Sequence, residues 1–359
     1  MVVKRIVRIL ALLVVMILVL AGAAAFVFYS RVDEPFRGYE GEAQELEIAP
    51  GSGTRAIGEK LVAAGIVRDL VTYRVALWLS GDARHLKAGE YRFDRPMSAR
   101  DALAKIARGE VDLVNVTFRE GLTIAEMAAI FEAQGLGTAA SFREAASNAT
   151  LVRDLDRSAT DLEGYLFPET YAVSRHVMPQ QLVRAMVDRF THVLTQELRD
   201  AALARGLSVR QLVTLASIVE KETGAADERP LVAAVYSNRL KIGMGLQCDP
   251  TVIFALQRVG RFDGNLSRDD LAFDSPYNTY KYPGLPPGPI AAPGKGSLEA
   301  AARPAEADYL YFVSRNDGTH AFARTLDEHN RNVQKFQVQY FREKRMAERR
   351  RDQAGTSSR

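Results

Sequence analysis

An uncharged apolar run near the N-terminus constrains this chain most. It extends over 20 residues from Ile9 to Phe28. At ~1.5 Å rise per residue, a helix of that length spans ~30 Å, which is the thickness of a bilayer core. Lys4, Arg5 and Arg8 precede the run and predict a cytoplasmic N-terminus by the positive-inside tendency. The small residues at 23–25 leave a cleaved signal peptide as the alternative, but the run is longer than a usual signal-peptide core, which favours an uncleaved anchor.

Composition indicates folded domains behind this anchor. The 359-residue chain is 47% hydrophobic and 25% charged, as is ordinary for globular proteins, and its remaining length suits two or three domains. The net charge is +3, and the tail 341–359 alone carries seven Arg/Lys against three Asp/Glu. The rest of the chain therefore has no basic excess, and nucleic-acid binding is not indicated. We interpret this tail as basic and disordered.

The cysteine and histidine content argues against disulfides and metal sites. Cys248 is the single cysteine, so no intramolecular disulfide can form. The five histidines are scattered and form no pair with zinc-ligand spacing. No Gly-rich phosphate loop is present either, so we expect neither a metal nor a cofactor.

Two similar segments follow a polar, turn-rich stretch at 29–44 that reads as a linker. Each segment, 46–66 and 114–136, reads as a strand, a turn with Gly and Thr, a helix and a Gly stop. The expected N-caps and stops are Thr54, Thr123, Gly65 and Gly135. The pattern is similar to a LysM-like glycan-binding module, and the alternative is two ordinary βα units that pack together.

A helix around Ala216–Thr223 carries two glutamates beside an apolar stripe. At about 100° per residue, Glu220 and Glu222 fall on opposite flanks of that stripe, so at most one should face a given cleft. A carboxylic acid held against apolar packing has a raised pKa and can serve as a general acid near neutral pH. The alternative is that both glutamates are half-solvated boundary residues.

Polar and aromatic loops surround this helix in the sequence. The segment 162–171 contains Glu163 and Tyr165 and could face a sugar or plug the core. The stretches 244–253 and 275–290 are dense in Pro, Gly, Asn and Gln, a composition typical of segments that line a site. Their neutral hydrogen-bonding groups suit a ligand with hydroxyl and acetamide groups.

These segments, in this order, resemble the YceG-like family of endolytic murein transglycosylases. The most specific pieces are Leu246–Thr251, Tyr277–Tyr280 and Gly284–Gly288, and the match runs from about residue 45 to 340. The resemblance implies an α+β fold with an N-terminal transmembrane helix, a LysM-like βα subdomain and a mixed α/β catalytic domain. The implied boundaries are 1–8 (cytoplasmic), 9–28 (membrane), 29–44 (linker), 45–140 (LysM-like), 141–340 (catalytic) and 341–359 (tail).

The resemblance also implies a reaction and its residues. One carboxylic acid, Glu220 by the family pattern, would act as acid and then base while the muramic acid's own C6 hydroxyl closes a 1,6-anhydro ring. Glu222 would then support the helix or the edge of the cleft. Candidate substrate contacts are Glu163, Tyr165, Gln247, Asp249, Asn278 and Tyr280, with loop-stabilising hydrogen bonds as the alternative role for each.

The implied setting is the cell wall. The substrate would be nascent peptidoglycan strands, cut at the MurNAc-β-1,4-GlcNAc bond, with the chain held in the bacterial inner membrane and its catalytic domain in the periplasm. Peptidoglycan synthases in the same membrane are the expected partners. Two alternatives remain open, namely a hydrolytic muramidase and a non-catalytic protein that binds the wall.

Overall fold

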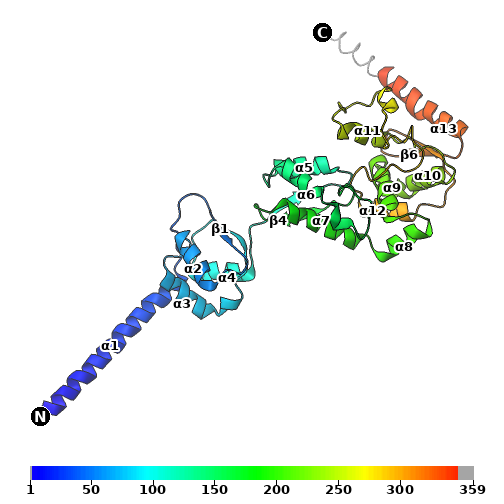
Figure 1. Cartoon of the computed structure of the whole chain (residues 1–359). Helices are drawn as coiled ribbons and strands as arrows, with labels where there is room; N and C mark the ends of the chain where they lie inside the picture. The colour runs from blue at the N-terminus through cyan, green and yellow to red at the C-terminus, as the bar shows by residue number, and fades with distance from the viewer. Residues whose placement is uncertain (1, 347–359) are drawn as a thin grey trace, which may run out of the picture. The chain divides into compact units, whose positions relative to one another are not determined.

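The computed structural model describes residues 2–346 of the chain (Figure 1). The described residues are mainly helical and contain three two-stranded sheets, so the predicted mixture of α and β structure is confirmed. The chain divides into two compact units. Unit 1 contains the residues up to Val114 together with Ala172–Arg175, and unit 2 contains Asn115–Tyr171 and the residues from His176 onward.

Helix α1 (Val2–Asp33) covers the whole predicted membrane span. By length and composition, its stretch Leu12–Asp33 could cross a membrane, and the side chains that the structure describes between Leu12 and Val27 are exposed. The predicted linker at 29–44 was wrong in its first part, because the helix continues to Asp33. Val32 is fully buried in the core of unit 1, and Asp33 accepts a 2.6 Å hydrogen bond from Arg100.

Unit 1 is built on a strand–helix–helix–strand order followed by one more helix. Strands β1 and β2 pair antiparallel, with Leu46 opposite Tyr91. The larger buried side chains include those of Ile48, Leu61 and Phe93, and they fill the space between this sheet and the helices. The elements are β1 (Gln44–Ile48), α2 (Thr54–Ala63), α3 (Leu70–Ser80), β2 (Gly89–Phe93) and α4 (Ala99–Arg108).

The helix caps of both units test the predicted starts and stops. Thr123 caps α5 with a full capping box, as predicted. Thr54 does not cap α2, because the N-cap is Gly53, which has no side chain, and Thr54 is already helical. Gly65 and Gly135 follow their helices at φ +67° and +70°, a left-handed conformation that costs glycine little, so both predicted stops are confirmed.

The same element order follows along the chain, mostly within unit 2. β3 pairs with β4. The two helices that lie between these strands in sequence, α5 and α6, pack against each other. The second βα segment therefore belongs to unit 2 and not to one subdomain with the first segment, and the units divide at 114/115 where the sequence suggested 140/141. The elements are β3 (Val114–Thr117), α5 (Ile124–Ala133), α6 (Ala139–Ala146) and β4 (Thr170–Val173).

Helix α9 lies at the centre of the remaining part of unit 2, in contact with α8, α10, α11 and α12. Strands β5 and β6 form an antiparallel pair. Residues 341–346 of the predicted disordered tail continue a helix, and 347–359 lie outside the described residues. The elements are α7 (Pro179–Val193), α8 (Gln196–Ala204), α9 (Val209–Glu222), α10 (Arg229–Lys241), α11 (Asp249–Arg258), α12 (Lys295–Ala302), β5 (Tyr311–Ser314), β6 (His320–Ala323), α13 (Leu326–Val333) and a π-helical turn (Gln334–Gln339).

Candidate active site

Helix α9 presents its two glutamates at the end of a buried stretch. Ser208 begins the helix with a capping box that also involves Gln211. Every residue from Leu212 to Val219 is buried, because the helix is surrounded by other helices. Glu220 and Glu222 follow in the last turn, where this packing ends. Their side chains contact different elements, which confirms that they lie on opposite flanks.

The Glu220 carboxylate is held by three donors. Its Oε2 accepts hydrogen bonds from the backbone N–H of Gly294 at 2.9 Å and from the hydroxyl of Ser297 at 2.7 Å. Its Oε1 lies 3.3 Å from Nη2 of Arg229. Only 6% of the side chain is exposed, so the expectation of a half-solvated boundary residue was wrong here. Glu220 is thus tied to the N-terminus of α12 and to α10.

Arg229 joins Glu220 to a second carboxylate. The same Nη2 atom lies 3.2 Å from Oε2 of Glu120, which belongs to the turn before α5. Partial burial raises the pKa of Glu120, and the charge of Glu220 raises it further, while Arg229 opposes both effects. A cavity of ≈ 300 Å³ is lined by Glu120, Glu220 and Glu126, among others. One arginine therefore serves two neighbouring acids beside an open space.

Gly294 is needed at this place for reasons of space. A Cβ added to it would come within 1.8 Å of Oε1 of Glu120. The missing side chain lets the Glu120 carboxyl approach the first turn of α12, whose unpaired N–H groups favour negative charge.

Glu222 lies on the other flank, against α10 and the start of α11. Its Oε1 is 3.2 Å from Sγ of Cys248, which donates the hydrogen bond as a thiol, and Tyr236 is a second hydrogen-bond partner. Burial raises the pKa of Glu222, whereas the hydrogen bonds from Cys248 and Tyr236 oppose that rise. Burial also raises the pKa of the Cys248 thiol, which favours its neutral, donating form. As whole residues, Glu222 and Glu220 are both half-buried.

Two of the segments richest in family motifs meet beside Glu222. The hydroxyl of Thr279 accepts a 2.9 Å hydrogen bond from the backbone N–H of Cys248, and its carbonyl accepts one from the N–H of Gln247 at 3.2 Å. The Thr279 hydroxyl also lies 2.9 Å from that of Thr251. These bonds fix the loop 275–290 against the first turn of α11.

Three predicted contact residues are exposed at this junction. Gln247 is exposed and adopts φ +50°, which is uncommon for a residue other than glycine and is typical of functional loops. The hydroxyl of Tyr280 donates a 2.6 Å hydrogen bond to Asp249, and the Tyr280 side chain is 38% exposed. Gln247, Asp249 and Tyr280 can therefore meet a ligand on the Glu222 side of α9.

Two other predicted contact residues are buried. Asn278 is fully buried, and its amide donates to the carbonyls of Leu271 and Phe273, so it organises the loop. Tyr165 is 1% exposed and donates a 2.7 Å hydrogen bond to Asp156. A ring at that depth cannot stack on a sugar. For these two residues the structure supports the alternative structural role and corrects the expectation of direct contact.

Glu163 occupies a separate apolar cavity. Both of its carboxyl oxygens lie 3.2 Å from the backbone N–H of Ile124, at the start of α5. Burial raises the pKa of Glu163 to about 8. The cavity beside it measures ≈ 540 Å³, and Glu126 lines both this cavity and the one beside Glu220. Gln247, Asp249 and Tyr280 line neither of these two cavities.

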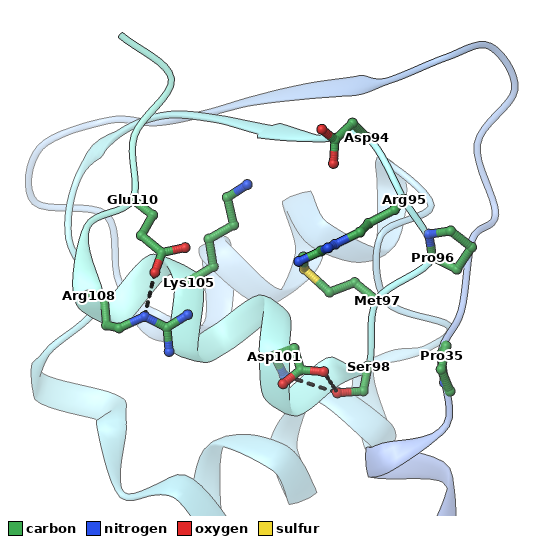
Figure 2. A pocket seen from close by; sticks show the side chains of 10 residues that line it. All are labelled: Pro35, Asp94, Arg95, Pro96, Met97, Ser98, Asp101, Lys105, Arg108 and Glu110. Carbon is green, nitrogen blue, oxygen red and sulfur yellow. Dashed lines mark hydrogen bonds and ion pairs between the residues drawn. The ribbon is translucent and has the colours of Figure 1, made fainter.

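Unit 1 also contains a cavity, of ≈ 780 Å³ (Figure 2). Its charged lining residues are of both signs, and two of them, Arg108 and Glu110, form an ion pair at 2.6 Å. Ser98 caps α4 by accepting a hydrogen bond from the backbone N–H of Asp101, and its hydroxyl donates to the Asp101 carboxylate. None of the predicted site residues lines this cavity.

Comparison with known proteins agrees with the family resemblance of the segments 246–251, 277–280 and 284–288. The sequence model of the YceG-like family matches residues 46–335. The chain belongs to the YceG-like family. A protein of Bacillus subtilis named endolytic murein transglycosylase is 31% identical over 328 residues, which cover 87% of this chain and 90% of that protein.

Two further proteins are similar to this YceG-like chain. A Streptococcus pneumoniae protein, also named endolytic murein transglycosylase, is 31% identical over 80% of this chain, which spans 57% of that protein's length. The crystal structure of a yceG-like protein, lmo1499, from Listeria monocytogenes superposes with a TM-score of 0.55 at 31% identity. The superposed region covers 81% of this chain and 98% of the Listeria chain.

Several residues of the site in this YceG-like chain were not predicted. Ser297 is 77 positions from Glu220 in sequence, and no pattern in the sequence connects the two. Tyr236 falls within an ordinary helical run. Glu120 was detectable in principle, because it is a charged residue in the turn between a predicted strand and helix. Among the described residues, no group of three or more His, Cys, Asp or Glu is arranged to hold a metal ion.

Proposed function

We propose that this chain is an endolytic murein transglycosylase with Glu222 as its acid and base. Two relatives with that name are 31% identical over 80–87% of the chain. The observation that carries the residue assignment is the position of Glu222. Its carboxyl group has a pKa raised by burial, and it lies beside loops with exposed polar side chains.

The contacts favour Glu222 over Glu220, the residue selected from the sequence. A general acid must hold a proton near neutral pH and reach the substrate. Burial raises the pKa of Glu222, and Gln247, Asp249 and Tyr280 are exposed close by. Glu220 lines a cavity, but its carboxylate is bonded to an arginine and to two further donors. Such bonds suit a carboxylate that holds α12 and α10 together, and Glu220 remains the alternative.

The proposed reaction uses one carboxyl group twice. Protonated Glu222 gives its proton to the glycosidic oxygen as the bond from that oxygen to C1 of MurNAc breaks, and the GlcNAc end leaves as an alcohol. The Glu222 carboxylate then takes the proton of the MurNAc C6 hydroxyl, whose oxygen bonds to C1 and closes the 1,6-anhydro ring. No water is consumed, and Glu222 ends in its starting form. Most other glycosidases divide these tasks between two carboxylates.

The neighbours of Glu222 would position the carboxyl group. The Cys248 thiol and Tyr236 both donate to it, and both are buried, so they can hold one rotamer of Glu222 without reaching the substrate. Gln247, Asp249 and Tyr280 would bind sugar hydroxyl or acetamide groups. Glu163, in its own cavity, would bind a more distant part of the strand.

The proposed setting follows from α1 and the family. The basic residues before the apolar run support a cytoplasmic N-terminus and a periplasmic catalytic unit, with α1 as a single-pass anchor in the inner membrane. The strand–helix–helix–strand order of unit 1 supports a LysM-like role in holding glycan. From that position the enzyme would meet strands as synthases make them and would terminate their growth.

Product analysis tests the proposed function. Purified full-length protein is incubated with peptidoglycan, and the products are identified by mass spectrometry. We expect 1,6-anhydro-MurNAc ends from the wild type and from Glu220→Gln, and almost none from Glu222→Gln. Reducing ends without the anhydro ring would indicate a hydrolytic muramidase. Binding of glycan without any cleavage would indicate a wall-binding protein.

A further inference from the structure

Helix α3 exposes an unusual apolar face in unit 1. Trp78, the only tryptophan of the chain, is 80% exposed, and Val71, seven positions earlier, is 49% exposed. Arg74 lies between them on the same face, at i+3 from Val71, and is also exposed. The helix is apolar but only 11 residues long, so it is too short to span a bilayer. A helix of this length and composition is typical of the core or of the membrane interface, and this face is not in the core.

Helix α1 brings unit 1, which contains α3, close to the bilayer. The apolar run ends at Phe28, and Val32, four residues later in the same helix, is fully buried in the core of unit 1. At ~1.5 Å per residue these positions are ~6 Å apart along the axis. The headgroup layer on each side of a bilayer is roughly 5–8 Å thick. Unit 1 therefore begins within the headgroup layer, and α3 packs directly against α1 in this unit (Figure 1).

We propose that the α3 face formed by Val71, Arg74 and Trp78 lies in the lipid–water interface and binds an anionic phospholipid surface. The proposal rests on α1 being the membrane anchor. It adds a second attachment that would fix the orientation of unit 1 on the membrane.

The chemistry of the face fits this partner. Tryptophan prefers the level of the headgroups, because its ring is apolar and its indole N–H is a hydrogen-bond donor. Arg74 has no hydrogen-bond or ion-pair partner among the described residues, so its charge is available to a lipid phosphate. The nearby Arg68 is already paired with Glu34 at 3.2 Å. Because this face carries the charge of Arg74 and an indole N–H, a lipid phosphate is a better partner for it than a basic protein surface would be.

The single tryptophan makes the test direct. Full-length protein is reconstituted into vesicles of phosphatidylethanolamine and phosphatidylglycerol, and flotation confirms that α1 has inserted. We expect the fluorescence emission of Trp78 in the vesicles to lie at shorter wavelength than in the same protein unfolded in a solution without detergent. It should be protected from an aqueous quencher. Lipids brominated near the headgroup end of the acyl chain should quench it more strongly than lipids brominated at the chain end.

Two variants control the measurement. Trp78→Phe should lose the tryptophan signal and gives the background. Arg74→Glu keeps the reporter and reverses the charge, and we expect a loss of bromolipid quenching that is larger in anionic than in neutral vesicles. Flotation with Trp78 still open to the aqueous quencher would overturn the proposal. A blue-shifted Trp78 that bromolipids do not quench would also overturn it, because the face would then be covered by protein. Failure to float would overturn the anchor, whatever the enzymatic activity.

Discussion

The two flanks of α9 place the same side chain, two residues apart, in different chemical surroundings. On one flank Glu220 is bound by Arg229, Ser297 and a backbone N–H, which are the partners of a charge that holds elements together. On the other flank Glu222 meets a neutral thiol and Tyr236, and burial raises its pKa. The difference shows that the partner elements, and not the position on the helix, decide the chemical surroundings of each carboxyl group.

The largest effect should come from removing the acid on the Glu222 flank. Glu222→Gln keeps the size and polarity of the side chain but cannot give or take the proton. We expect the rate of 1,6-anhydro end formation to fall by about 10²–10⁴-fold, the usual contribution of general acid–base catalysis. Mass spectrometry of timed digests measures this rate. A variant with near wild-type activity would refute the assignment of Glu222.

Removing the cation on the Glu220 flank should mainly affect stability. Arg229→Met leaves Glu220 and Glu120 close together without compensation, at an expected cost of about 3 kcal/mol in the free energy of unfolding. The pKa of Glu120 is already raised, so in the variant the loss of stability should be small in acid and grow as the pH rises above 4.5. Chemical denaturation at several pH values measures it, with Arg229→Lys as the control that keeps the charge. A loss that does not depend on pH would contradict the argument.

Glu220→Gln should be milder. The amide can still accept from Gly294 and Ser297 but loses its ion pair with Arg229, which should lower the free energy of unfolding by about 1–2 kcal/mol. We expect activity to stay within about tenfold of the wild type, because no proton would be transferred at this position. Thermal unfolding and the product assay together measure both effects. A loss of activity equal to that of Glu222→Gln, in folded protein, would show that the two flanks do not differ in function.

The smallest effect should come from Cys248. Its hydrogen bond lowers the pKa of Glu222 against the effect of burial, so Cys248→Ala should raise that pKa further. Because the acid must be protonated to react, activity is present below this pKa and lost above it, and the alkaline limb of kcat/KM should move up by about one pH unit or less, which is ~1.4 kcal/mol. Cys248→Ser keeps a donor and should leave the limb nearly in place. If Cys248→Ala and Cys248→Ser gave the same pH profile of kcat/KM, the hydrogen bond from position 248 would have no influence on the pKa of Glu222.

Local features of this chain could be predicted from the sequence. The membrane-length helix, the Thr123 N-cap and the stops at Gly65 and Gly135 depend on nearest neighbours in the chain, and the structure confirms them. The opposite flanks of Glu220 and Glu222 follow from helical periodicity alone.

Burial and long-range pairing could not be predicted in the same way. Tyr165 and Asn278 looked suited to a sugar by residue type, but the structure buries both, because their partners come from segments that the sequence does not align with them. The strand that completes each strand–helix–helix–strand order also lies beyond the predicted βα segments, and for this reason the division between the units differs from the predicted boundary.

The sequence by itself determined an apolar helix of membrane-spanning length, the family and a helix with two glutamates on separate flanks, because each rests on local spacing or on motif order. Only the tertiary structure brought Arg229, Gly294 and Ser297 to Glu220, and Cys248 and Tyr236 to Glu222. A carboxyl group's affinity for its proton depends on the charges, donors and burial around it in space. Those neighbours come from α10, α11 and α12, so the choice between the two glutamates depends on the packing of these helices around α9.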